Sequence, residues 1–271
     1  MKQRRTTIFL SLLLTLAAGL CFAQVRGWND FSSDRRGVPD WEVNKELPND
    51  LFTFARIEYY SDSGYRRRGG GRWTTDYPDA DLNLSYRLNE MTSMEVDPNG
   101  AVVRLTDDEL FDYPFIYIVE PGRLVFSDEE VKQLRRYCLN GGFLMIDDFW
   151  GEEEWSNLEY HIKLVFPDRE IVSIPHEHNI FHAVFPLEER PQIPSIGWVR
   201  SGRTYERPDA QEVHYKGIFN DDGQMMVIIC HNTDLGDGWE REGEDPEYFK
   251  RFSEKSAYPL GINILFHSMT H

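Results

Sequence analysis

Short apolar segments alternate with amphipathic segments along most of this chain. Phe115–Val119 and Phe143–Ile146 are continuous apolar runs of strand length, which is typical of strands buried on both faces of a sheet. Between them, Ser127 and Glu130 have the spacing of a capping box, and the helix that they start is predicted to end at Gly141. Two buried strands joined by a helix predict parallel pairing.

The same alternation predicts further elements on both sides of this unit. Leu84, Leu88 and Met91 share one helical face, and Asp79 or Asp81 is expected to cap the start of that helix. The turn at 220–223 predicts an antiparallel pair of strands at an edge of the sheet. We therefore expect a three-layer, flavodoxin-like α/β fold, with a mostly parallel sheet and helices on both faces. The other predicted elements are strands at Leu51–Ile57, Ile171–Ile174, Glu212–Phe219 and Met225–Cys230, and helices at Leu82–Met91, Glu153–Val165 and Tyr258–Met269.

The first 23 residues have the pattern of a secretory signal peptide. The cationic stretch Lys2–Arg5 precedes an apolar run from Ile8 to Leu20, and small residues at Cys21 and Ala23 predict cleavage before Gln24. The apolar run is shorter than the ~20 residues that span a bilayer. We expect an exported protein, periplasmic or secreted, with no transmembrane span in the mature chain. An uncleaved N-terminal anchor is the alternative.

Composition indicates that the rest of the chain is an acidic, folded domain. Residues 24–49 show no sustained periodicity and are predicted to be an extended lead-in, followed by a single α/β domain at 50–271. The formal net charge is −17, and loss of the three cations in the signal peptide would make it −20. Such a surface repels phosphate backbones and anionic lipid headgroups, which excludes nucleic acid as a partner class. A protein partner in the cell envelope is compatible with this charge.

Two cysteines, Cys138 and Cys230, remain after the predicted signal peptide. Cys138 falls within a helical pattern and Cys230 ends an apolar strand, which is typical of buried thiols. We expect two free cysteines, although an oxidising compartment permits a disulfide between them.

A glycine-rich basic segment, Arg66–Arg72, follows the first predicted strand. One interpretation is a mobile, solvated loop. The other is a loop that grips an anionic ligand through guanidinium groups and backbone N–H groups.

Clusters of polar residues follow several of the predicted strands. In open α/β sheets, ligands bind outside the carboxyl ends of the strands, so these side chains are expected to converge on one rim. Carboxylates and imidazoles gathered there are suited to metal binding or to general acid–base chemistry. We consider Asp147, Asp148, His231 and Asp234 as catalytic candidates, and Asp76, Asp79, Asp81, Trp150, His176, His178, Asn232 and Asp237 as ligand-binding candidates.

Structural roles are the alternative for several of these residues. Asp148 and Asp81 are placed where an aspartate often caps the next helix, and Asp234 and Asp237 lie beside glycines in a predicted turn. No cluster has a strict metal-binding spacing such as His-Glu-x-x-His, so neither a metal nor any other cofactor is specified, although a divalent metal is compatible.

The order of motifs from Asn49 to His271 resembles the bacterial family Domain of Unknown Function 4159. The resemblance implies a fold similar to class I glutamine amidotransferases and the trehalose-utilisation ThuA-like proteins, but it implies no activity. At the elbow where the amidotransferases carry a nucleophilic cysteine, this chain has Asp147 and Asp148, so glutaminase activity is not expected. The motifs that carry the resemblance are Phe52–Arg56, Thr75–Asp81, Tyr113–Tyr117, Gly141–Gly151, His231–Asp237 and Thr270–His271.

Two functions fit these features. The first is a ligand-binding or assembly module that keeps an amidotransferase-like scaffold without its nucleophile. The second is a carboxylate- or metal-dependent hydrolase for a sugar-like substrate, in which Asp147 or Asp148 acts with the histidines and Asp234. Trp150, Trp155 and Trp239 are suited to stacking on sugar rings, and equally to a hydrophobic core.

Overall fold

The structure is a computed structural model that describes residues 35–43, 51–62 and 71–270. From Val38 onward the chain forms one compact unit, which contains the whole sheet. The predicted signal peptide, most of the lead-in and most of the basic segment (residues 66–70) lie outside the described residues. Export and anion binding by the basic segment therefore stay predictions.

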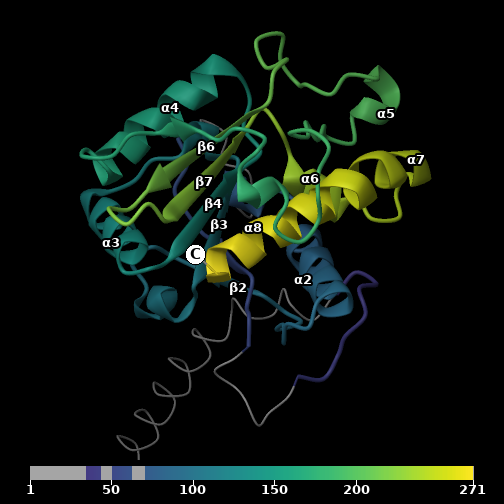
Figure 1. Cartoon of the computed structure of the whole chain (residues 1–271), viewed down its shortest axis with the longest axis horizontal. Helices are drawn as coiled ribbons and strands as arrows, with labels where there is room; N and C mark the ends of the chain where they lie inside the picture. Colours follow the sequence, from purple (N-terminus) through teal and green to yellow (C-terminus); the bar gives the residue numbers. More distant parts are fainter. Residues whose placement is uncertain (1–34, 44–50, 63–70, 271) are drawn as a thin grey trace, which may run out of the picture. The chain divides into compact units, whose positions relative to one another are not determined.

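The described residues contain a seven-stranded sheet in the order β2-β1-β3-β4-β7-β6-β5 (Figure 1). The first five strands in this order are parallel to one another, and β6 is antiparallel to both of its neighbours. The prediction of a mostly parallel sheet with an antiparallel edge is confirmed. The strands are β1 Ala55–Ile57, β2 Ala101–Val103, β3 Phe115–Val119, β4 Phe143–Asp147, β5 Val172–Ser173, β6 His214–Phe219 and β7 Met225–His231.

Helices cover both faces of this sheet, which gives three layers. Helices α3 and α4 pack on one face, and α2, α6 and α8 pack on the other (Figure 1). No helix in the described part of the chain has the length and apolar character that a bilayer crossing requires. The helices are α2 Asp79–Met91, α3 Asp128–Leu139, α4 Gly151–Val165, α5 Trp198–Ser201, α6 Leu235–Glu240, α7 Pro246–Tyr248 and α8 Tyr258–Thr270, with the π-helix η6 Phe249–Ala257 between the last two and the short 3₁₀ helices η2 Arg72–Thr74, η3 Asp108–Asp112, η4 Pro121–Arg123 and η5 Asn179–Phe181.

Local sequence signals explain how α3 begins and ends. The Ser127 hydroxyl accepts from the backbone N–H of Glu130 at 3.3 Å, and the Glu130 carboxylate accepts in return from the Ser127 N–H at 2.8 Å. This is the predicted capping box, and a cap of this kind contributes about 1 kcal/mol. Gly141 follows the helix with φ +99°, a conformation that glycine adopts without strain.

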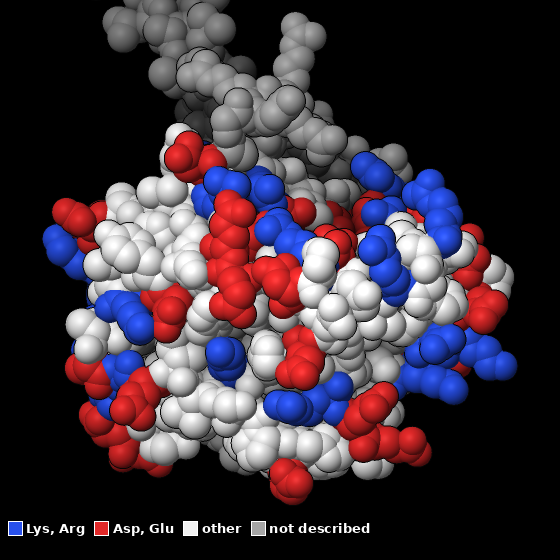
Figure 2. Space-filling view, turned by 90° about the horizontal axis from the view of Figure 1, so that it is seen from above, with Lys and Arg blue, Asp and Glu red and all other residues white. Residues whose placement is uncertain are grey.

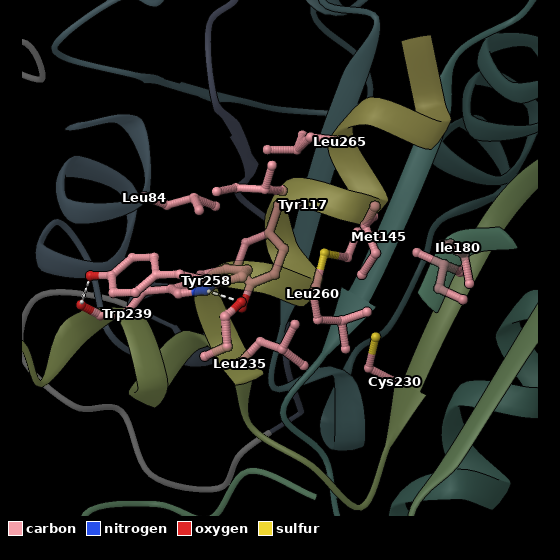
Figure 3. Close-up of a cluster of buried hydrophobic side chains, with 14 of the residues drawn as sticks. Leu84, Tyr117, Met145, Ile180, Cys230, Leu235, Trp239, Tyr258, Leu260 and Leu265 are labelled. Carbon is pink, nitrogen blue, oxygen red and sulfur yellow. Dashed lines mark hydrogen bonds between the residues drawn. The ribbon is translucent and has the colours of Figure 1, made fainter. Parts of the chain in front are cut away.

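The hydrophobic core is divided between the two faces by the alternation of side chains along each strand. Tyr117 and Met145 point toward α6 and α8, where they meet Trp239 and Leu260 (Figure 3). Their neighbours along the strands, including Ile146, point toward α3 and α4. Each such side chain contributes roughly 1.5–3 kcal/mol when fully buried.

Both cysteines are free and buried, as predicted. Cys138 belongs to the core beneath α3, and Cys230 to the core on the other face of the sheet. Because the sheet lies between the two thiols, no disulfide joins them.

Several predicted boundaries and roles are wrong in instructive ways. Helix α2 begins at Asp79, three residues before the predicted start, and its N-cap is Pro78 without a side-chain bond, so neither Asp79 nor Asp81 caps it. The late strand pair is not itself the edge, because β7 also pairs with β4. Strand β5 has only two residues, both exposed, and β2 is a strand that the apolar pattern did not predict.

Candidate functional site

Backbone strain gathers where the parallel strands end. Glu120, Asp148 and Asn232 directly follow β3, β4 and β7, and each has a positive φ, of 49°, 55° and 61°. Asp76, in the segment between β1 and α2, has φ +62°. Non-glycine residues adopt this conformation at a cost of about 1–3 kcal/mol, and such residues cluster at binding and active sites. The carboxyl edge of the sheet therefore has the backbone signature of a functional site.

Asp147 is the last residue of β4 and is fully buried on the face covered by α6. Its Oδ2 accepts from the Tyr117 hydroxyl at 3.1 Å and from the Gly236 N–H at 3.0 Å. Its Oδ1 has no hydrogen-bond partner among the described residues. Burial raises the pKa of Asp147 to about 7, although the hydrogen bond from Gly236 opposes this shift.

Asp148 turns away from β4 and accepts from the indole N–H of Trp150 at 2.9 Å. Trp150, not Asp148, is the N-cap of α4, and the backbone N–H of Trp150 donates to Glu154 at 2.8 Å. The interpretation of Asp148 as a helix cap is therefore wrong. Trp150 itself is buried and orients this carboxylate, so it offers no surface for stacking on a ligand.

Helix α6 contributes three acidic residues at three-residue spacing. Asp234 caps its N-terminus by accepting from the Asp237 N–H at 2.6 Å, so these residues start a helix and not the turn that the structural interpretation predicted. The Asp237 carboxylate accepts from the Ile196 N–H and from Arg241 Nε, the latter at 2.8 Å. Glu240 ends the helix.

These carboxylates form two groups that share Asp76. In the first, one oxygen from each of Asp76, Asp148 and Asp234 lies within 4.8 Å of the others. In the second, Asp76 is joined in the same way by Asp237 and Glu240. Gly236 makes this packing possible, because a Cβ at that position would overlap the Asp76 carboxylate. The fold thus brings together side chains from three separate segments of the chain.

The first group is almost inaccessible to solvent, with exposed fractions of 8%, 6% and 4% for Asp76, Asp148 and Asp234. Burial, followed by repulsion from neighbouring carboxylates, raises the pKa of each of them well above its usual range. Burial, together with Asp237, also raises the pKa of Glu240 to about 7. Ionised carboxylates are therefore unfavourable here unless a cation neutralises them.

The two groups differ in charge compensation. Arg241 forms salt bridges with Asp237 at 2.8 Å and with Glu240 at 2.6 Å. Among the described residues, no lysine or arginine forms a salt bridge with Asp76, Asp148 or Asp234. The Asp76 Oδ2 atom also lacks a hydrogen-bond partner there. The first group is thus a buried acidic cluster without a direct salt bridge from the described residues, although Arg56 and Arg241 act on Asp76 from a distance and oppose the rise of its pKa.

The other acidic and amide candidates lie outside the two carboxylate groups. Asp81 is paired with the buried Arg56. Asp79 is half-buried at the first position of α2. Asn232 links two segments, since its Oδ1 accepts from the Gly151 N–H and its Nδ2 donates to the Glu212 carbonyl, both at 2.8 Å.

None of the predicted histidines joins the carboxylates. His231 points to the opposite face of the sheet, where it stacks on Phe149 with ring centroids 4.7 Å apart and lies within 3.2 Å of the Gly151 carbonyl. Burial lowers the pKa of His231 to about 4, so it is neutral at pH 7. His231 thus lies at the carboxyl edge, as expected, but the expectation that its side chain converges with Asp147 and Asp234 is wrong.

The two earlier histidines also lie elsewhere. His176 Nε2 is 2.9 Å from the Leu187 carbonyl oxygen. His178 lines a surface pocket of about 430 Å³ with Phe219, Met225 and His267. Because β7 begins at Met225, this pocket is at the amino end of β7, opposite the carboxylate cluster. Aspartates thus converge at the carboxyl edge of the sheet as expected, whereas the histidine side chains do not join them.

Sequence reasoning missed Glu240, Arg241 and Tyr117. The signal for Glu240 was present, since residues 234, 237 and 240 are spaced three apart and a helix places such residues near one another. Arg241 and Tyr117 had no comparable signal, because they meet the aspartates only through the packing of α6 on β3 and β4.

The face of the molecule in Figure 2 shows acidic and basic side chains interspersed, with no uniform acidic field. Carboxylate oxygens are hard ligands that prefer Mg²⁺, Ca²⁺ and Mn²⁺. Chemically, this arrangement can hold such an ion.

Comparison with known proteins gives a family without an assigned activity. No curated protein matches the chain. The model of the family described as a domain of unknown function (DUF4159) matches residues 53–269, and the chain belongs to this family.

Proposed function

We propose that this protein is an exported, cation-dependent ligand-binding module, in which Asp76, Asp148 and Asp234 hold a divalent ion at the carboxyl edge of the sheet. The observation that carries the proposal is the buried acidic cluster with which no lysine or arginine of the described residues forms a salt bridge. An ion held by three side chains keeps further coordination positions for water or for an oxygen-bearing ligand.

Electrostatics supports a cation in preference to a permanently protonated cluster. Burying an ionised carboxylate without a partner is strongly unfavourable, so the group must bind either a proton or a cation. A shared proton satisfies only two oxygens, whereas an ion at the centre of the group is within reach of all three carboxylates. The unpartnered Oδ2 of Asp76 provides an acceptor that no described donor uses.

The positions of the histidines favour binding over hydrolysis. The hydrolase interpretation paired Asp147 or Asp148 with Asp234 and with three histidines. Asp234 does meet Asp148, but His176, His178 and His231 do not belong to the carboxylate cluster. A non-catalytic module requires only the carboxylates.

We also propose that the scaffold is amidotransferase-like. The support is the elbow after β4, where Asp148 takes a positive φ just before α4, at the place where the resembling enzymes carry their nucleophile. Asp148 replaces that nucleophile with a metal ligand.

Calorimetric titration of the purified chain with Mn²⁺, Ca²⁺ and Mg²⁺ tests the proposal, with Asp148→Asn as the key variant. Asparagine tolerates the left-handed conformation at this position, so the substitution removes charge with little change in backbone preference. We expect one ion to bind the native chain with a dissociation constant below about 1 mM. Asp148→Asn should weaken binding at least about tenfold and stabilise the cation-free protein by roughly 1 kcal/mol.

Asp222→Asn is the matched control, because Asp222 is exposed in the β6–β7 turn, away from the cluster. It should leave both affinity and stability unchanged. The proposal is abandoned if the native chain binds none of the three ions, or if Asp148→Asn binds as tightly as the native chain.

A further inference from the structure

The two carboxylate groups have the same make-up but different neighbours. Each contains Asp76 and two further carboxylates, with ligand atoms within 4.8 Å of one another. By ligand chemistry alone, the cluster therefore offers two adjacent cation positions with Asp76 between them, an arrangement that proteins use to hold pairs of metal ions.

Arg241 engages both carboxylates that belong only to the second group. Its Nε lies 2.8 Å from Asp237 Oδ1 and its Nη2 lies 2.6 Å from Glu240 Oε2. A third contact, 3.1 Å from Nη1 to Glu244, holds the outer end of the guanidinium. The backbone N–H of Arg241 donates to the Asp237 carbonyl, so the residue is fixed at both its main chain and its side chain.

The remaining oxygen of Asp237 is also used, because Oδ2 accepts from the backbone N–H of Ile196. A metal ion at the second position would have to displace the guanidinium from both carboxylates or compete with this N–H. It would also sit beside Arg241 and beside an ion at the first position, and like charges at such distances repel strongly when partly buried. Asp148 and Asp234 also accept N–H bonds, from the Trp150 indole and from Asp237, but no described lysine or arginine forms a salt bridge with Asp76, Asp148 or Asp234.

We infer that Arg241 is a built-in cation that fills the second carboxylate group and limits the cluster to a single metal ion. This inference rests on the proposed function, since it specifies how many ions the same site accepts. Arg241 is thus a residue that determines metal stoichiometry, and the difference between a one-ion and a two-ion cluster is decided by one side chain.

Replacement of Arg241 tests this inference through the stoichiometry of Mn²⁺ binding, measured by calorimetry and by equilibrium dialysis. The native chain should bind one ion. Arg241→Gln removes the cation and should bind two ions, while Arg241→Lys retains a cation and should bind one. Arg87→Gln is the control, because Arg87 pairs with Glu242 and Tyr258 outside the cluster.

A second variant keeps the inference testable if Arg241→Gln does not fold. Because Arg241 already neutralises Glu240, Glu240→Gln should change Mn²⁺ affinity by less than about threefold. A loss of more than about tenfold would mean that Glu240 is itself a ligand, which overturns the inference.

The outcomes separate the inference from the proposed function. If the native chain binds no ion, the proposed function fails. If the native chain binds one ion and folded Arg241→Gln also binds one, the site stands and the role of Arg241 is rejected. Two ions in the native chain would likewise reject it.

Discussion

Two sets of buried aspartates lie close together in this protein and have opposite surroundings. Asp81 is 2% exposed and meets the fully buried Arg56, whose Nε donates to both carboxylate oxygens at 3.0 and 3.1 Å. Asp76, Asp148 and Asp234 are nearly as buried, yet no described lysine or arginine pairs with them. The comparison shows that burial alone does not mark a binding site. What distinguishes the second set is that no described cation forms a direct salt bridge with it.

The Arg56–Asp81 pair also helps to position the acidic cluster that contains Asp76. Arg56 Nη1 donates to the Trp73 carbonyl at 3.1 Å and to the Thr75 carbonyl at 2.9 Å. These bonds hold the segment that leads directly into Asp76. Arg56, whose charge is paired with Asp81, thus fixes the backbone that positions the unpaired carboxylate of Asp76.

The largest effect is expected from breaking the compensated pair. Asp81→Asn leaves the Arg56 guanidinium buried without a counter-ion, and loss of one partner of such a pair costs about 3–5 kcal/mol. Urea denaturation at neutral pH should show this loss, in contrast to the gain expected for Asp148→Asn. Asp128→Asn, an exposed substitution at the start of α3, is the control. A loss below about 1 kcal/mol for Asp81→Asn would remove the contrast between the two sets.

A smaller change in the free energy of unfolding is expected when the pH is varied. Burial raises the pKa of Asp147, and also that of Glu240, to about 7 in the cation-free protein. A raised pKa means that the folded state binds the proton more tightly than the unfolded state does. The stability gained from this protonation is fully present below the unfolded-state pKa of about 4, and it is lost as pH rises through about 7. Between about pH 5 and pH 8, the free energy of unfolding should fall by roughly 2–3 kcal/mol from Asp147 alone.

Asp147→Asn should flatten this pH dependence, because its amide does not titrate, and a saturating divalent cation should reduce it as well. Thermal unfolding across the pH range, with and without Mn²⁺, measures both effects. Stability that rises with pH in the cation-free native protein would contradict the prediction.

The smallest change in stability and in cation affinity is expected from replacing His231. Its ring is neutral at pH 7 and packs against Phe149 and Trp155 on the face opposite Asp147. His231→Phe keeps the stacking, so it should change stability by less than about 1 kcal/mol and cation affinity by less than about twofold. A tenfold loss of affinity in the calorimetric titration would place His231 in the site after all.

The sequence alone determined much of the architecture of this protein. The uninterrupted apolar runs of β3 and β4 predicted buried parallel strands, and the Ser127–Glu130 capping box predicted the start of α3. These features depend on residues close together in the chain, where spacing and hydrogen-bonding capacity are decisive. The order of motifs also identified the family, and the aspartates after β4 and β7 were correctly chosen as neighbours on one edge.

Only the tertiary structure decided which of the candidate side chains meet. Asp147 ends β4 on the face covered by α6, whereas His231 ends β7 on the other face, because alternation along each strand sends the last side chain up or down according to register. The pairing of Arg56 with Asp81, and of Arg241 with Asp237 and Glu240, depends on distances that no local pattern contains. Electrostatic energy depends on the separation of charges in space, so the difference between a paired and an unpaired carboxylate appears only when the chain is folded.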